Sequence, residues 1–175
     1  MSSEDPPFVM NPPVAVVFKN PIMFLAFGFG SGLAKYFPGT AGTLASVPLY
    51  LLLAQLGLFE YVLLVCAAFV AGVFICKYAA HVMMVHDHRG IVWDEFVGFW
   101  IAMLGAPVHW VWVLIGFVYF RIFDMAKPWP ISWVDKRVHG GFGIMLDDVL
   151  AGIAACASLN LTIFFLAPHI QGWLA

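Results

Sequence analysis

Residues 96–120 read FVGFWIAMLGAPVHWVWVLIGFVYF, a run that contains no Asp, Glu, Lys or Arg. About 20 apolar helical residues cross the hydrocarbon core of a bilayer, so this run is long enough to span one. Gly105, Ala106 and Pro107 interrupt it near its middle, and a proline disfavours helix at the residue before it. We therefore expect two short helices joined as a hairpin, over residues 92–105 and 109–124, rather than one long span.

The rest of the chain has the same apolar character. Of its 175 residues 63% are hydrophobic and 10% are charged, whereas ordinary soluble domains have about 45–50% and about 25%. Uncharged runs over 36–59, 61–76 and 149–175 predict further helices near 41–58, 60–82 and 143–166. The expected fold class is all-α: a polytopic membrane protein with about five short transmembrane helices and an N-terminal interfacial or re-entrant segment. Residues 1–20 are expected to be disordered or interfacial, and 21–175 to form a single helical catalytic domain.

The distribution of basic residues predicts the orientation in the membrane. If the N-terminus is cytoplasmic, five crossings place every Lys and Arg on one side and only Glu60, His109 and the uncharged C-terminal end on the other. Cytoplasmic loops carry an excess of Lys and Arg, so we expect the charged face to be cytoplasmic. A single span over 96–120 would divide the basic residues between both faces. The N-terminal MSSEDPPFVMNPP is acidic and proline-rich, unlike a signal peptide.

Two pairs of adjacent acidic residues, Asp94-Glu95 and Asp147-Asp148, each lead into an apolar run. One alternative is that they only complement the positive end of a helix dipole, but buried carboxylates near a membrane are costly unless something compensates them. Neighbouring helical residues point about 100° apart. We therefore expect each pair to place one carboxylate in a common centre, while the other bridges, binds a second metal ion or meets a cation. Carboxylate oxygens favour Mg²⁺ over zinc.

Basic and Gly-rich segments could hold an anion beside such a metal. Arg121 and Asp124 share a helical face, with Lys127 three residues further on; an interfacial salt bridge is the alternative role. The segment from Gly28 to Thr43 precedes a helix in the way that anion-binding loops do, although close helix packing explains it equally well. His86, His88 and His139 could be ligands or solvated residues.

Five motifs in this order resemble the phosphatidylglycerophosphatase A family: GFGSGL at 28–33, PGTAGTLASVP at 38–48, HDHRGIVWDEFVGFW at 86–100, FRIFDMAKPWPI at 120–131 and DKRVHGGFGIMLDDVLAG at 135–152. The resemblance implies a bacterial inner-membrane lipid phosphatase that depends on Mg²⁺. Its reaction would hydrolyse phosphatidylglycerophosphate to phosphatidylglycerol and inorganic phosphate. The implied partner is an anionic phospholipid; neither nucleic acid nor an obligate protein partner is expected.

These expectations assign a role to each candidate residue. Mg²⁺ would be held by Asp94, Glu95, Asp147 and Asp148. The residues expected to act in catalysis are Asp87, Asp94, Glu95, Asp124 and Asp148. Those expected to bind the phosphate are Thr40, Gly42, Thr43, Arg121, Lys127, Arg137 and His139. Asp87 or Asp124 could be the general base, and a covalent aspartyl-phosphate remains an alternative to direct attack by water.

Two other classes of function fit parts of the pattern. A small ion-coupled carrier or channel would also use intramembrane acids and broken helices, but the predicted external side offers almost no polar lining. A scaffold that binds partners or lipid headgroups would not require pairs of acids beside basic residues.

Overall fold

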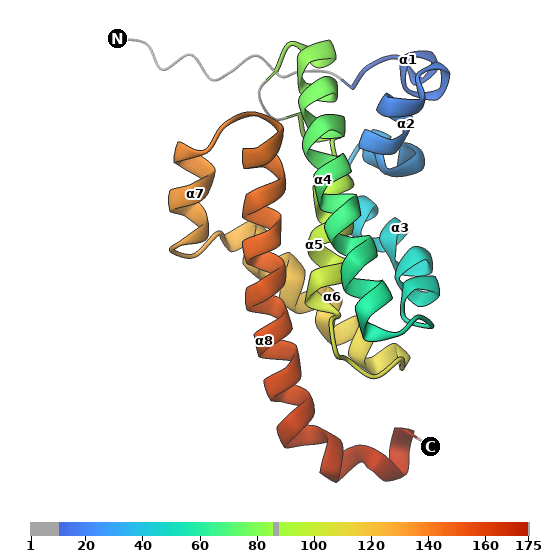
Figure 1. The fold of residues 1–175 in the computed structure, drawn as a ribbon, viewed down its shortest axis with the longest axis vertical. Helices are drawn as coiled ribbons and strands as arrows, with labels where there is room; N and C mark the ends of the chain where they lie inside the picture. Colours follow the sequence, from blue (N-terminus) through green and yellow to red (C-terminus); the bar gives the residue numbers. More distant parts are fainter. Residues whose placement is uncertain (1–10, 86–87, 175) are drawn as a thin grey trace.

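The computed structural model describes residues 11–85 and 88–174, and this part of the chain is entirely helical (Figure 1). Four short elements accompany five longer helices. In chain order the elements are α1 (Val14–Lys19), α2 (Pro21–Ala26), the 3-10 helix η1 (Gly28–Leu33), α3 (Pro38–Leu53), α4 (Leu58–Met83), α5 (Trp93–Ala102), α6 (Trp110–Ala126), α7 (Ile131–Arg137) and α8 (Gly140–Leu174).

The predicted break inside residues 96–120 is confirmed. Helix α5 ends at Ala102, and the chain turns through Gly105, whose φ of 78° suits a residue without a side chain. His109 then caps α6, because its Nδ1 accepts a hydrogen bond from the Val111 amide at 3.3 Å. The uncharged run therefore forms two helices rather than one.

The other three expected helices are also present, with shifted ends. Helix α3 begins at Pro38, three residues before the expected start, because proline is well suited to the first turn of a helix. Helix α8 continues to Leu174, beyond the expected 166. The short elements α1, α2, η1 and α7 were not predicted. Each has six or seven residues, too few for a hydrophobic period, and such short helices depend on tertiary packing.

Helix α5 lies at the centre of the packing, and eight of its ten residues are buried. It packs against α3, α4, α6 and α8. Glycines allow its close approach to α8: a Cβ on Gly98 would lie 2.8 Å from the carbonyl oxygen of Asp148, and a Cβ on Gly152 would collide with the carbonyl oxygen of Gly98. Small residues at such crossings are typical of membrane helices, where close backbone packing replaces hydrophobic association.

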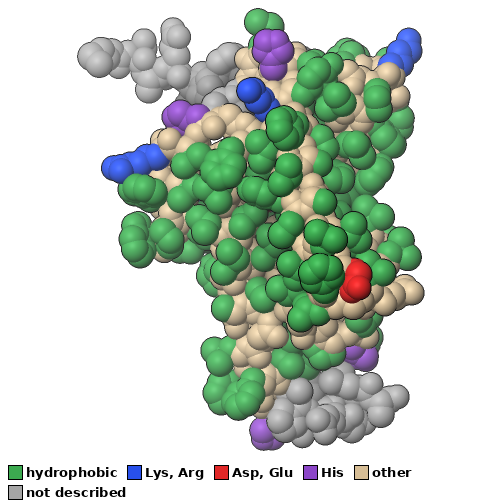
Figure 2. All heavy atoms as spheres, in the orientation of Figure 1, with side chains coloured by type: hydrophobic (Ala, Val, Ile, Leu, Met, Phe, Trp, Pro, Cys, Tyr) green, Lys and Arg blue, Asp and Glu red, His purple; other side chains and the backbone are tan. Residues whose placement is uncertain are grey.

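Within the described residues, two helices are long and apolar enough to cross a membrane. They are Leu58–Met83, with a mean hydropathy of 2.4, and Gly140–Leu166, with 2.1. Only 17% and 22% of the residues in their most apolar windows are buried in the protein, whereas the core helix of a soluble protein is mostly buried. Figure 2 shows hydrophobic side chains over most of the visible face, with Lys and Arg near its upper end. These features indicate association with a membrane.

Candidate active site

The acidic pairs come together where α5 and α8 cross. Asp94 and Glu95 lie in the first turn of α5, and Asp148 lies in the apolar N-terminal half of α8. One carboxylate oxygen from each of these three residues lies within 4.8 Å of the other two. Asp94 and Asp148 are 9% and 3% exposed. Three carboxylates so close and so buried repel one another unless protons or a cation compensate them.

The oxygen atoms of this acidic cluster, Asp94, Glu95 and Asp148, suit a hard divalent cation. Glu95 Oε2 and Asp148 Oδ2 are buried and have no hydrogen-bond partner within the described part of the chain, which leaves acceptor capacity directed into the cluster. Mg²⁺ takes carboxylate oxygens and usually retains several waters, so three protein ligands suffice. The donors present therefore fit a metal ion.

Arg121 joins this cluster to the start of α3. Its Nη1 lies 3.8 Å from Glu95 Oε1, 2.5 Å from Asp124 Oδ2 and 3.5 Å from Thr43 Oγ1. The Arg121 and Asp124 side chains are each only 14% exposed. Asp124 lies one turn after Arg121 on α6, so their predicted sharing of one helical face is confirmed. The guanidinium is thereby fixed beside the acidic cluster with its planar fork available to an anion.

The N-terminus of α3 approaches the same cluster. A Cβ on Gly39 would collide with Glu95 Oε1 and would lie 3.2 Å from both terminal nitrogens of Arg121. A Cβ on Gly42 would lie 2.6 Å from Val92, just before α5. The N-cap residue of α3, Phe37, makes no side-chain hydrogen bond to this end of the helix, where the first backbone N–H groups have no partner within the helix. The site thus combines carboxylates, a guanidinium and a helix N-terminus.

Lys127 organises the opposite side of the site. Its Nζ donates hydrogen bonds to Asp147 Oδ2 and Asp135 Oδ1, both at 2.6 Å. Burial by itself would lower the pKa of Lys127, but these two hydrogen bonds outweigh it and raise the pKa above its ordinary value. Asp147 therefore meets a cation while its neighbour Asp148 joins the acidic cluster, the division expected for adjacent helical residues. Asp94 and Glu95 both contribute oxygens to the cluster, and Glu95 also lies 3.8 Å from the Arg121 guanidinium.

Comparison with known proteins identifies the family. The sequence profile of phosphatidylglycerophosphatase A matches residues 24–163. The chain belongs to the phosphatidylglycerophosphatase A family. It is 48% identical over 152 residues to the phosphatidylglycerophosphatase A of Escherichia coli (strain K12), covering 86% of each chain. It is 46% identical over 147 residues to that of Haemophilus influenzae, covering 83% of this chain and 90% of the relative. The activity is that of a phosphatidylglycerophosphatase, a phosphomonoesterase.

A third relative has a different name. It is a putative phosphatidylinositol-3-phosphatase of Bacteroides thetaiotaomicron, 38% identical over 138 residues, which are 75% of this chain and 86% of the relative. No solved structure matches the chain. The part matched by the phosphatidylglycerophosphatase A profile includes the acidic cluster, Arg121, Lys127 and the start of α3.

The remaining candidates are not members of the acidic cluster or lie outside the described residues. Arg137 is exposed, and its guanidinium lies 4.7 Å from the centre of the Trp133 ring. His139 is exposed, whereas Thr40 is half-buried near the start of α3. His88 is buried, and its Nδ1 accepts a hydrogen bond from the Gly90 amide at 3.0 Å. His86 and Asp87, the latter a candidate base, lie outside the described residues.

Two features of the site were not found by sequence reasoning. Gly39 approaches Glu95 and Arg121 closely, and its place directly after Pro38 at a helix start was a usable signal. Asp135 pairs with Lys127 through α7, and nothing in the sequence pattern indicated that this short helix would fold back toward the site.

Proposed function

We propose that this enzyme hydrolyses phosphatidylglycerophosphate to phosphatidylglycerol and inorganic phosphate in a Mg²⁺-dependent reaction at the cytoplasmic face of a bacterial inner membrane. The observation that carries the proposal is the acidic cluster of Asp94, Glu95 and Asp148, with Arg121 next to it. A cation held by the carboxylates can bind a phosphate group. The guanidinium fixed beside them can donate hydrogen bonds to the same phosphate. The names of the two phosphatidylglycerophosphatase A relatives support the choice of lipid.

Asp94, Glu95 and Asp148 would hold the metal ion. When bound, Mg²⁺ supplies positive charge for the phosphoryl oxygens and makes a water molecule easier to deprotonate. Asp147 is a ligand candidate from the sequence, but its hydrogen bond to Lys127 makes it better suited to positioning that lysine. The proposal therefore needs three protein ligands rather than four.

Arg121 would hold the phosphoryl group that is transferred. Its guanidinium presents several N–H donors in one plane, which match two phosphoryl oxygens. The hydroxyl of Thr43 lies 3.5 Å from the guanidinium, and the amides of Gly39 and Thr40 lie at the uncapped start of α3. Charge that develops on the phosphoryl oxygens in the transition state would thus meet donors already in place.

Asp124 would act on the reaction through Arg121. Because it accepts a hydrogen bond from Nη1 at 2.5 Å, we assign it to fixing the guanidinium rather than to abstracting a proton. A carboxylate of the acidic cluster would then accept the proton of the attacking water. Rapid-quench experiments with labelled substrate test this assignment: label that stays on the protein after acid quenching and is released by hydroxylamine would show a covalent aspartyl-phosphate instead.

The proposed arrangement in the membrane follows the helix directions in Figure 1. Helices α3, α4, α5, α6 and α8 would alternate in direction as five membrane segments, with residues 21–175 forming one catalytic domain. Helix α5 has ten residues, or about 15 Å, and so reaches only part of the way through a hydrocarbon core of about 30 Å. Burial of α5 among its neighbours, rather than contact with lipid, would keep it at this depth.

The test is phosphate release from phosphatidylglycerophosphate in detergent micelles by purified protein. We expect release with Mg²⁺, none with EDTA, and a loss of about 100-fold or more in kcat for Asp94→Asn. Glu60→Gln is the matched control, because Glu60 is an exposed acid in the first turn of α4, away from the acidic cluster. Full activity of Asp94→Asn in folded protein would refute the proposed metal site.

A further inference from the structure

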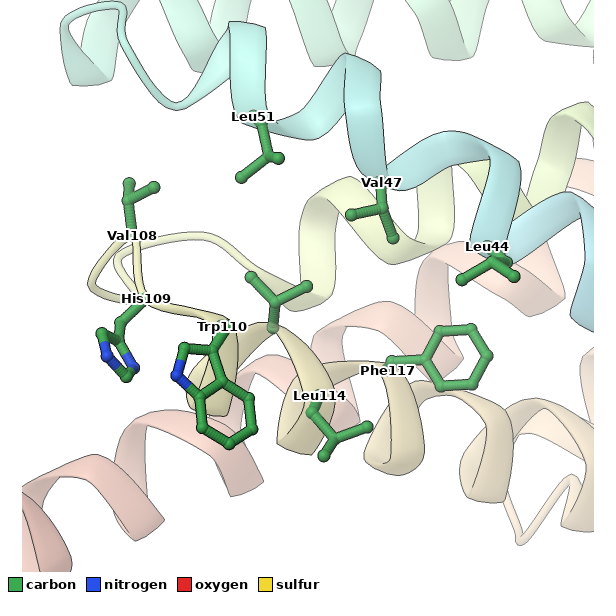
Figure 3. Close-up of a pocket in the computed structure, with 9 residues that line it drawn as sticks. Leu44, Val47, Leu51, Val108, His109, Trp110, Leu114 and Phe117 are labelled. Atoms are coloured by element: carbon green, nitrogen blue, oxygen red, sulfur yellow. The ribbon is translucent and has the colours of Figure 1, made fainter. Parts of the chain in front are cut away.

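An apolar groove runs between α3 and α6 (Figure 3). Its volume is about 400 Å³, within the range of sites that accept small molecules. Leu44, Val47 and Leu51 line it from α3, and Val113 and Phe117 line it from α6. In Figure 3 the Val47 and Leu51 side chains point from α3 toward α6, with His109 and Trp110 at the far end.

The groove continues from the site along the same two helices. The Arg121–Thr43 contact joins α6 to α3, Leu44 follows Thr43, and Phe117 precedes Arg121 by about one helical turn. From that end the helices run in opposite directions, so that Leu51 lies toward the start of α6. The groove therefore begins next to the reaction site, and apolar side chains line it from there as far as His109 and Trp110.

A membrane phospholipid has this same order of parts, with a phosphate at one end and hydrocarbon leading away from it. Leu44 and Leu51 are seven residues apart on α3, which corresponds to about 10 Å along the helix. This length suits part of one acyl chain. A water-soluble phosphomonoester would gain nothing from such a trough, whereas an acyl chain gains by burying apolar surface in contact with Val47, Leu51 and Val113.

We propose that the α3–α6 groove binds one acyl chain of the phospholipid substrate and so positions its headgroup phosphate at Arg121. This proposal rests on the proposed function and adds to it the site at which the lipid tail is recognised. The groove would make the enzyme selective for phosphomonoesters attached to long hydrocarbon chains.

The chain offers a closely matched test. Leu51 and Leu52 are neighbours on α3, but they line different apolar grooves: Leu52 faces a second groove of about 380 Å³ formed with Leu56, Leu64 and Trp100. Leu51→Trp would fill the far end of the α3–α6 groove. Leu52→Trp would add the same bulk to the same helix at a groove that does not continue to Arg121.

The substrates are dioleoyl and dihexanoyl phosphatidylglycerophosphate, which share a headgroup and differ in chain length. We expect Leu51→Trp to raise KM for the dioleoyl lipid about tenfold, since shortened apolar contact weakens binding. It should leave kcat/KM for the dihexanoyl lipid within about twofold, because the shorter chains end before Leu51. Leu52→Trp should leave KM and kcat/KM unchanged for both lipids. Equal effects on both lipids, or no effect on the dioleoyl lipid, would overturn the proposal.

A second measurement does not depend on how well the tryptophan variant folds. Phosphatidylglycerophosphate with a photoreactive diazirine near the end of one acyl chain is irradiated with Asp94→Asn protein, which is expected not to consume it. The proposal is supported if α3 and α6 peptides are labelled and excess unlabelled substrate suppresses this labelling. Labelling spread over α4 and α8 and unaffected by competitor indicates bulk lipid and refutes it. Failure of the proposed function can be distinguished from failure of the groove proposal, because in the former case wild-type protein would hydrolyse neither lipid.

Discussion

At the scale of single residues, Arg121 connects more of the site than any carboxylate does. It contacts Glu95 of α5, Asp124 of its own helix and Thr43 of α3. A guanidinium suits this position because it is always charged and its donors lie in one plane, so it can keep two protein partners while presenting an edge to phosphate. Lysine would carry the same charge at a single point.

Arg121→Lys keeps the positive charge at this position but removes the planar arrangement of donors, so it tests the two contributions separately. We expect kcat to fall about 10- to 100-fold with a smaller change in KM, because the fork is most valuable as charge develops in the transition state. Arg121→Gln should be worse, since it also leaves Glu95 and Asp124 without their cation. Steady-state kinetics in mixed micelles measure both constants. Wild-type kcat in Arg121→Lys would mean that charge alone is needed.

Asp148 should control metal binding independently of turnover. A metal that binds only the folded protein, present at about 100 times its dissociation constant, stabilises it by about 2.7 kcal/mol. We expect Mg²⁺ to raise the unfolding temperature of wild-type protein in detergent and to have little effect on Asp148→Asn. Thermal unfolding followed by circular dichroism, with and without EDTA, measures the difference. Glu60→Gln should keep the shift, and an equal shift in Asp148→Asn would exclude this acid as a ligand.

At the scale of helices, the site depends on how closely α5 and α8 approach. Gly98 and Gly152 lie at their crossing, next to the turn that carries Asp148. Any side chain there has to move one helix away from the other, and the separation changes the distances among Asp94, Glu95 and Asp148. Packing and ligand geometry are therefore linked through two glycines.

Gly152→Ala should expose this link. A methyl group forced into a tight backbone contact costs about 1–3 kcal/mol of stability, and we expect a weaker response of the unfolding temperature to Mg²⁺ as well. Gly57→Ala is the control, because the nearest atoms to its new methyl group belong to the flexible, exposed Glu60 side chain. Unfolding and metal titrations of both variants test this. Unchanged metal affinity in a destabilised Gly152→Ala would show that packing and site are independent.

Helix prediction from this sequence succeeded where long uncharged runs ended at Gly or Pro. The hairpin around Gly105 and Pro107 is the clearest case. Prediction failed for α1, α2, η1 and α7, because six or seven residues cannot display a helical period and their stability comes from neighbours. The meeting of Asp94 and Asp148 was inferable from topology alone. The pairing of Lys127 with Asp135 was not, since it depends on where the unpredicted α7 packs.

At the scale of the whole molecule, charged side chains pair near the acidic cluster, whereas many large apolar side chains are exposed. Lys127, Asp135 and Asp147 form one hydrogen-bonded group near the acidic cluster. Leu58 and Phe59, at the start of α4, are 69% and 75% exposed. Exposed apolar side chains of this kind agree with association with a membrane.

The proposed orientation is testable with single cysteines in a background that lacks Cys66, Cys76 and Cys156. A membrane-impermeant maleimide should label Glu60→Cys in cells whose outer membrane has been opened. It should label Lys136→Cys only after the inner membrane is also permeabilised, because the basic end is expected to be cytoplasmic. Both positions are exposed in the structure. The opposite pattern would invert the topology and move the proposed active site to the other face.

The depth of Asp147 and Asp148 within the apolar part of α8 has a consequence for biogenesis. An Asp at the centre of an inserting helix costs about 2.5–3.5 kcal/mol, and α8 carries two within its candidate span, off its centre, where the cost is smaller. The ribosome synthesises α8 after α5 and Lys127. In the proposed topology, the lysine and a cation would therefore neutralise the two acids as α8 enters the bilayer. Acquisition of the metal would then be the final step of membrane insertion, and a nascent chain halted before residue 140 would leave the carboxylates of α5 without a site.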